Sequence, residues 1–127
     1  MLTLNFKDNC KVNIHYGHEA WHQNGKLHRD NGPAVEYANG DKKWFRDEKL
    51  HRLDGPAVED ADGTKYWYQN GKRHRLDGPA IERADGTKLW NNNGNLHRLD
   101  GPAIEHPDGG KEWWYNGECQ VTSAGLQ

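Results

Sequence analysis

Four histidines of the chain stand in the same context, each followed directly by an arginine and then by acidic residues. They are His28, His51, His74 and His97, and a glutamate follows each arginine by seven residues. Histidine and carboxylate side chains can together hold a metal ion or act as acid and base, and arginine can bind phosphate. These residues are therefore the first candidates for a metal, catalytic or anion site.

The regular spacing of these residues argues against a metal site. The block HRLDGPA, which reads HRDNGPA in the first unit, recurs every 23 residues with a following Val or Ile and Glu. If each repeat adds two strands, equivalent side chains lie about 9 to 10 Å apart, whereas zinc ligands lie about 2.0 to 2.3 Å from the metal. A residue present in every unit is more often scaffold. We therefore expect no metal, and we expect each arginine to pair with acidic residues of its own repeat.

Nucleophilic catalysis has little support. Ser123 is the only serine, and Cys10 and Cys119 are the only cysteines. Almost five repeats separate the two cysteines, which is too far for the roughly 7 Å that a disulfide allows between Cα atoms. The sequence predicts a protein that is not an enzyme and uses no cofactor.

The elements that must position these residues are short strands. Asn-Gly pairs such as Asn70-Gly71 are typical of type I′ hairpin turns, a second Asp-Gly turn follows in most units, and no window has the apolar period of a helix. Segments 64–69 and 72–84 differ in length, so the bend at 77–79 must absorb the difference. We expect an all-β protein, an elongated antiparallel β-hairpin repeat array; a β-solenoid with short sides is the alternative.

The repeats divide the chain into three parts. Residues 1–20 are expected to form an N-terminal capping strand and half-repeat, in which residues 2–6 alternate like a strand. Residues 21–112 hold four 23-residue β repeats, and residues 113–127 form a C-terminal half-repeat and tail. We expect columns of Trp, Val or Ile, and Leu to be buried between neighbouring repeats.

Composition agrees with a thin repeat array. Only 19 of the 127 residues are Leu, Ile, Val or Phe, but six Trp, 15 Gly and a net charge of -2 do not describe a disordered chain. The small net charge argues against nucleic acid as a partner, and no stretch approaches the roughly 20 apolar residues of a membrane span. Because the N-terminus lacks the apolar core of a signal peptide, we expect a cytoplasmic protein.

Positions that differ between repeats are the candidates for binding. Strand alternation places residues 66 and 68 on the face opposite Trp67, and the aromatic residues on that face vary from repeat to repeat. Repeat two also has Asp-Glu where other repeats have Asn-Gly, and because Glu resists positive φ we expect a strained turn or one of another type. The predicted binding residues are Phe45, Asp47, Glu48, Tyr66, Tyr68 and Trp114.

The run WYQNGKRHRLDGPAIERADGTKLW at residues 67–90 resembles the MORN repeat, which has an aromatic residue before Asn-Gly-Lys-x-His and a later Asp-Gly. The HR-x-(D/N)-GPA block is similar to a MORN-like repeat of giant DNA viruses and tailed phages, and the likeness covers residues 13–117. The 15 residues from Asn-Gly to Asp-Gly indicate an insertion at the GPA bend relative to standard MORN units. The resemblance implies an extended antiparallel sheet that serves as a scaffold, and a viral source.

Together these observations predict a non-catalytic β-repeat interaction protein. The concrete expectation is a viral or phage accessory protein that binds and antagonises a host defence protein in the host cytoplasm. One alternative is a ligand-sequestering protein that binds a nucleotide or small anion, and another is a structural scaffold or lipid-associated MORN-type module. We expect a protein partner, and we expect the open edge strands at the ends of the array to permit homo-oligomerisation.

Overall fold

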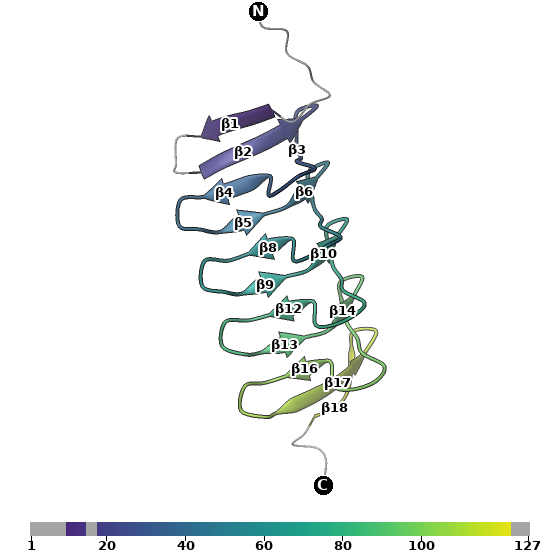
Figure 1. The fold of residues 1–127 in the computed structure, drawn as a ribbon. Helices are drawn as coiled ribbons and strands as arrows, with labels where there is room; N and C mark the ends of the chain where they lie inside the picture. Colours follow the sequence, from purple (N-terminus) through teal and green to yellow (C-terminus); the bar gives the residue numbers. More distant parts are fainter. Residues whose placement is uncertain (1–9, 15–17, 123–127) are drawn as a thin grey trace, which may run out of the picture.

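The structure, a computed structural model, describes residues 10–14 and 18–122, and this part of the chain contains strands and turns but no helix. Figure 1 shows the strands stacked in one row from the N-terminal to the C-terminal end, with small hairpins along one edge. The strands are β1 (Cys10–Ile14), β2 (His18–Gln23), β3 (Lys26–Leu27), β4 (Val35–Tyr37), β5 (Lys42–Lys43), β6 (Phe45–Arg46), β7 (Lys49–Leu50), β8 (Val58–Glu59), β9 (Lys65–Tyr66), β10 (Tyr68–Gln69), β11 (Lys72–Arg73), β12 (Ile81–Glu82), β13 (Lys88–Leu89), β14 (Asn91–Asn92), β15 (Asn95–Leu96), β16 (Ile104–Glu105), β17 (Lys111–Tyr115) and β18 (Glu118–Thr122).

One long open sheet runs through the molecule. Its strand order is β1-β2-β4-β5-β8-β9-β12-β13-β16-β17-β18, with β3 paired to β2, and every pairing is antiparallel. Three separate two-stranded hairpins, β6-β7, β10-β11 and β14-β15, lie beside it. The predicted elongated hairpin array is therefore confirmed. The strand predicted at residues 2–6 lies outside the described residues.

Repeat three shows how the unequal arms fit together. Tyr66 of β9 pairs with Ile81 of β12, whereas β10 pairs with the much nearer β11. Between these two pairings, the backbone N–H of Trp67 donates to the carbonyl of Ala80 at 2.7 Å, and the carbonyl of Trp67 accepts the backbone N–H of His74 at 3.0 Å. Residues 75–79 consequently leave the ladder as a loop, which is the bend that the segment lengths predict.

The core of the array is a line of small and branched residues. Ala34, Ala57, Ala80 and Ala103 are completely buried, and the Val or Ile that follows each of them is at most 9% exposed. The Trp column, predicted to be core, is only half-buried. In four of its members, Trp21, Trp44, Trp67 and Trp90, an arginine guanidinium stacks on the indole, so the column is covered partly by a charged side chain and not by core residues alone.

The C-terminal unit ends the array without a loop. β17 continues past Trp113 without a break and pairs with β18, with a register shift between Trp113 and Trp114. Within the described residues, β1 and β18 are the outermost strands of the sheet, and they carry Cys10 and Cys119 at opposite ends. No helix in the described part of the chain could cross a bilayer.

Candidate functional site

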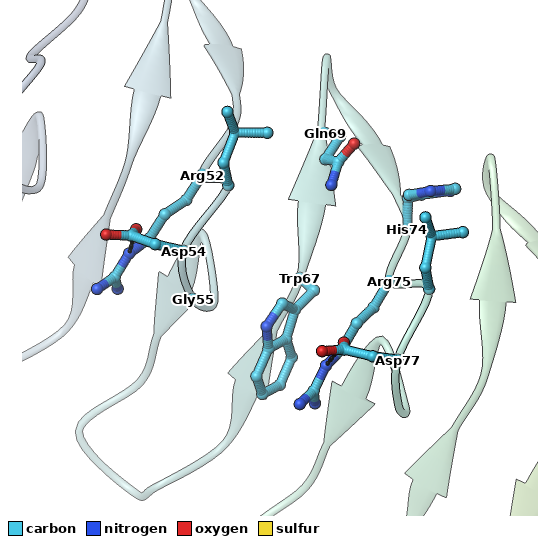
Figure 2. A pocket seen from close by; sticks show the side chains of 10 residues that line it. Arg52, Asp54, Gly55, Trp67, Gln69, His74, Arg75 and Asp77 are labelled. Carbon is cyan, nitrogen blue, oxygen red and sulfur yellow. Dashed lines mark hydrogen bonds and ion pairs between the residues drawn. The ribbon is translucent and has the colours of Figure 1, made fainter.

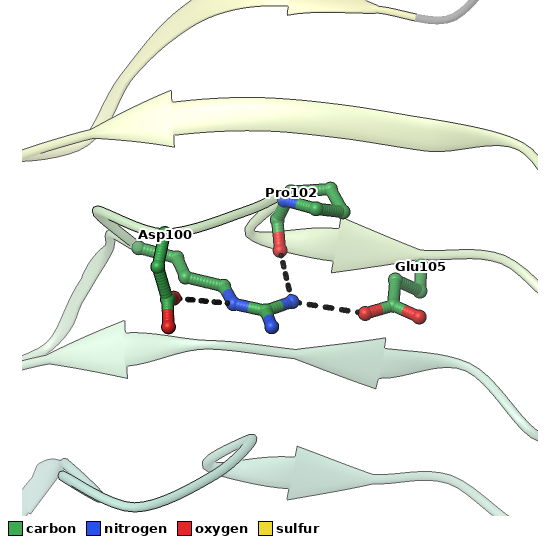
Figure 3. A network of polar contacts seen from close by, with 4 residues as sticks. Asp100, Pro102 and Glu105 are labelled. Carbon is green, nitrogen blue, oxygen red and sulfur yellow. Dashed lines mark hydrogen bonds and ion pairs between the residues drawn. The ribbon is translucent and has the colours of Figure 1, made fainter.

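Each of the four loops is closed by its own arginine. In repeat three, the guanidinium carbon of Arg75 lies 4.0 Å from the centre of the Trp67 ring, a cation–π stack. Arg75 also donates from Nη1 to the Pro79 carbonyl at 3.1 Å and from Nε to Asp77 at 3.1 Å. We call residues 28–33, 51–56, 74–79 and 97–102 the closed loops, and Figure 3 shows the contacts in the last of them.

Acidic residues of the same repeat neutralise these arginines. Nη1 of Arg98 lies 3.0 Å from Glu105, and the equivalent distance is 3.6 Å in repeats two and three and 3.9 Å in repeat one. Arg52, Arg75 and Arg98 also pair with the aspartate two residues later. The predicted internal ion pairs are confirmed, so the guanidinium groups hold the loops together.

Glycine in the closed loop makes room for this arginine. A Cβ atom on Gly78 would lie 2.9 Å from Cζ of Arg75, and the same distance is found at Gly55 and Gly101. Real Cβ atoms do not approach other heavy atoms that closely, so any larger residue has to displace the guanidinium. The Gly of the GPA block therefore leaves the guanidinium room to lie in its observed place.

The histidine column connects successive repeats. Nδ1 of His51 accepts the backbone N–H of Asn70, the first residue of the next hairpin turn, at 3.0 Å. The same bond joins His28 to Asp47, His74 to Asn93, and His97 to Asn116 at 3.0 to 3.1 Å. Burial, and then the nearby charge of Arg46, lower the pKa of His51 from its usual value. Among the side chains described, those of residues 19–122, no three His, Cys, Asp or Glu residues converge as metal ligands.

One residue of each closed loop faces the solvent. It follows the arginine, and in three repeats it is a leucine: Leu53 is 73% exposed, Leu76 84% and Leu99 78%. We call these three residues the leucine row. The expectation that the Leu columns are buried was wrong here. A leucine between charged residues in a Gly-Pro bend has no strand to carry it into the core, and that context was the available sequence signal.

Two grooves flank the loop of Leu53. The first groove, of about 350 Å³, lies between the closed loops of repeats one and two and includes Phe45 and His51 in its lining. The second, of about 570 Å³, lies between the loops of repeats two and three. Figure 2 shows Arg52 and Asp54 on one side of the second groove, Arg75 and Asp77 on the other, and Trp67 between them.

The predicted binding residues are spread over several repeats. Phe45 lies in the first groove, and Tyr66 and Tyr68 are half-buried in β9 and β10. Trp114 is half-buried in β17 and donates Nε1–H to Glu112 at 3.2 Å. The structure thus brings Phe45, and none of these other three aromatic residues, into a described groove beside the leucine row.

The turn of repeat two keeps the same backbone shape as the others. Asp47 and Glu48 have φ of 48° and 66°, beside 51° and 81° for Asn70 and Gly71. Both residues are exposed, and Glu48 donates its N–H to the Leu27 carbonyl of the preceding repeat at 2.8 Å. We expected either a strained turn or a turn of another type, and the strained turn is found. A left-handed backbone costs conformational energy for Glu, whereas Gly adopts it freely.

One variable position has become part of the core. Asn91 occupies the column of Phe45 and Tyr68, but it is only 3% exposed, and its Oδ1 is buried without a hydrogen-bond partner. A buried acceptor in that state destabilises the fold. The sequence shows the change from aromatic to Asn but not that the side chain is enclosed.

Comparison with known proteins assigns no family to the chain. No protein-family model matches it, and no curated protein sequence matches it either. Its function has to be inferred from its own residues, namely the closed loops, the leucine row and the two grooves.

Proposed function

We propose that this chain is a non-catalytic β-repeat interaction protein that binds a partner protein through the leucine row. The observation that carries the proposal is the exposure of Leu53, Leu76 and Leu99 at one position of three successive repeats. Large apolar side chains repeated on one surface mark interaction sites more often than isolated ones do. Their contact with a partner removes apolar area from water.

The closed loop supports this role because it presents its leucine on a braced backbone. The stack of Arg75 on Trp67 and the bond to Pro79 fix the loop on both sides of Leu76. A loop that is ordered before binding loses less conformational entropy when the partner arrives. The arginine and histidine columns are engaged within the fold, which supports a binding role over a catalytic one.

Charge beside the leucine row indicates what the partner offers. The side chains of Asp54, Asp77 and Asp100 are 87–88% exposed, next to the leucines in sequence. An apolar centre with an acidic rim complements an apolar patch bordered by lysine or arginine. We also propose that the repeats are MORN-like and that the partner is a host defence protein, as the resemblance to the MORN-like repeat of viruses and phages implies.

Affinity capture followed by quantitative binding tests the proposal. The tagged wild type and a Leu53→Ser, Leu76→Ser, Leu99→Ser variant are incubated with lysate of the cells in which the protein is made. A protein retained by the wild type is then purified, and its Kd is measured. We expect the triple variant to bind at least about tenfold more weakly with an unchanged urea midpoint.

Matched variants keep the result specific. Lys42, Lys65 and Lys88 are exposed in equivalent strands of the long sheet, so Lys→Ser at all three changes the surface without touching the leucine row. A Phe45→Ala, Tyr68→Ala variant tests the face that the sequence favoured. An equal Kd for the wild type and the leucine variant, or no specifically retained protein, would contradict the proposal.

A further inference from the structure

The spacing of the leucine row restricts the conformation of what can lie along it. Equivalent loops of neighbouring repeats are two strands apart, which is about 9.6 Å. A polyproline II helix advances about 9.3 Å for every three residues. A β-strand returns to the same face after about 6.7 Å, and seven residues of an α-helix span about 10.5 Å. Over the two intervals from Leu53 to Leu99, the length of the polyproline II repeat differs from the spacing of the loops by less than about 1 Å. The length of the α-helical repeat differs from it by about 2 Å.

The grooves on either side of the Leu53 loop suit side chains presented at that interval. Each groove contains an aromatic residue, Phe45 in the first and Trp67 in the second, and Leu53 lines both. Volumes of about 350 and 570 Å³ accommodate a proline ring or a branched aliphatic side chain with room to spare. Aromatic-lined grooves are a recurring receptor for polyproline II segments.

The charges at the rim select what lies between those side chains. The guanidinium groups of Arg52 and Arg75 are stacked on Trp44 and Trp67 and bonded to carboxylates and carbonyls. Asp54 and Asp77 remain highly exposed beside the grooves. Positively charged residues of a ligand therefore find exposed carboxylates beside the second groove, whereas the first groove has Asp54 and the exposed Arg46 in its lining.

We infer that the partner binds through an extended polyproline II segment with an apolar side chain at every third residue and lysine or arginine between them. This inference rests on the proposed function and adds the conformation and the sequence pattern of the ligand. Successive apolar side chains of the segment enter the first and second grooves, and the leucine row forms the ridges between them.

Selection from a random library of twelve-residue peptides tests the inference without knowledge of the natural partner. The full chain is the bait, and the leucine triple variant is used for counter-selection. We expect enriched peptides to have apolar residues at a period of three, with basic residues between them. A synthetic copy of an enriched peptide should bind the wild type at least about tenfold more tightly than the triple variant, and the lysine variant should bind like the wild type.

Two changes to the synthetic peptide test its conformation. Insertion of one residue between successive apolar positions should weaken binding at least about tenfold, because the side chains no longer meet the grooves. Proline in place of a residue that lies between two of the apolar positions should preserve binding, since proline fixes φ near the polyproline II value and breaks helices.

Several results would overturn the inference. They are a period of two or seven among the selected peptides, no enrichment over the triple variant, tolerance of the inserted residue, or loss of binding on proline substitution. If the purified partner still needs the leucines, such a result removes the polyproline II inference and leaves the proposed function intact. If the partner ignores the leucines as well, both fall.

Discussion

The guanidinium carbon of Arg75 lies 4.0 Å from the centre of the Trp67 ring, and this stack closes the loop that carries Leu76. The stack of Arg75 on Trp67 thereby has two structural roles. It covers one face of a half-buried indole, and it fixes the backbone that carries an exposed leucine. The same pair of residues recurs at 3.9 to 4.2 Å in the other three loops.

Substitution of this arginine should destabilise the array. Arg75→Ala removes the stack on Trp67, the bond to Pro79 and two partly screened ion pairs. We expect a loss of about 2 kcal/mol, mostly from the stack and the carbonyl bond. Urea unfolding followed by circular dichroism measures it. Arg83→Ala, at an exposed position of the same repeat, is the control, and equal effects of the two substitutions would refute the structural role of Arg75.

Gly78 and Arg75 should be energetically coupled. Gly78→Ala places a Cβ only 2.9 Å from Cζ of Arg75, so the guanidinium has to move and the substitution should cost about 1 to 3 kcal/mol in the wild type. In the Arg75→Ala background the obstacle is gone and the cost should largely disappear. A double-mutant cycle gives this coupling directly. Strictly additive effects would show that the glycine is needed for some other reason.

Stability should fall between pH 7.5 and 5.5 in a way that depends on His51. Its pKa in the folded protein is lowered from 6.5 by burial and by Arg46, and Nδ1 must stay unprotonated to accept the Asn70 N–H. The unfolded chain therefore binds the proton more readily. The contribution of His51 is complete above the unfolded pKa and is lost as the pH falls toward the folded pKa.

Replacement of His51 by asparagine isolates this effect. Asn offers an oxygen acceptor but does not titrate. Urea midpoints at pH 7.5 and 5.5 should differ less for His51→Asn than for the wild type. The same pH dependence in both proteins would exclude His51 as a source of acid sensitivity.

The strained turn of repeat two should be improvable. Asp47→Asn with Glu48→Gly restores the pair found in the other hairpins, and Glu48 has a φ of 66°. We expect a gain of about 1 kcal/mol, since glycine adopts that backbone without strain. Thermal unfolding checks it, with Asn70→Asp and Gly71→Glu as the reciprocal change that should lower stability. A double variant that is no more stable would show that the turn is relaxed as it stands.

Removal of the enclosed polar group of repeat four should also stabilise the fold. Asn91→Leu replaces a side chain of similar size whose Oδ1 is buried without a partner. The expected gain is about 1 kcal/mol in urea unfolding. Asn92→Leu, at the next, less buried position, should have little effect. Destabilisation by Asn91→Leu would mean that the amide contributes to packing or bonding.

Much of the architecture follows from the sequence because its signals are local and repeated. Asn70-Gly71 specifies a turn, the unequal lengths of 64–69 and 72–84 require a bend, and the Arg-to-Glu interval fixes the ion pairs. The positive φ of Asp47 and Glu48 shows that neighbouring repeats can impose a turn that those residues resist. Because the units repeat, the strand register of one unit determines the register of the next.

Burial was harder to predict than architecture. An indole such as that of Trp67 normally lies in the core. Here one face of the ring is covered by the guanidinium of Arg75, and the pattern of strands in the sequence does not predict this side-chain conformation. Leu76 and Asn91 show the two converse cases, an exposed aliphatic and an enclosed amide. Burial of each depends on which side chains and elements lie against it, and those contacts come from neighbouring repeats that the local pattern does not describe.

The residue that follows the arginine in the closed loop is Asp30 in repeat one and leucine in repeats two to four. Bonds that brace the loops of repeats two to four come from residues around this position, while the leucine itself extends into the solvent. Substitution of the leucine in repeats two to four should consequently leave these bonds unaltered. The binding specificity of such a chain can be changed one repeat at a time, because a single side chain is exchanged at a position that the repeat array already fixes.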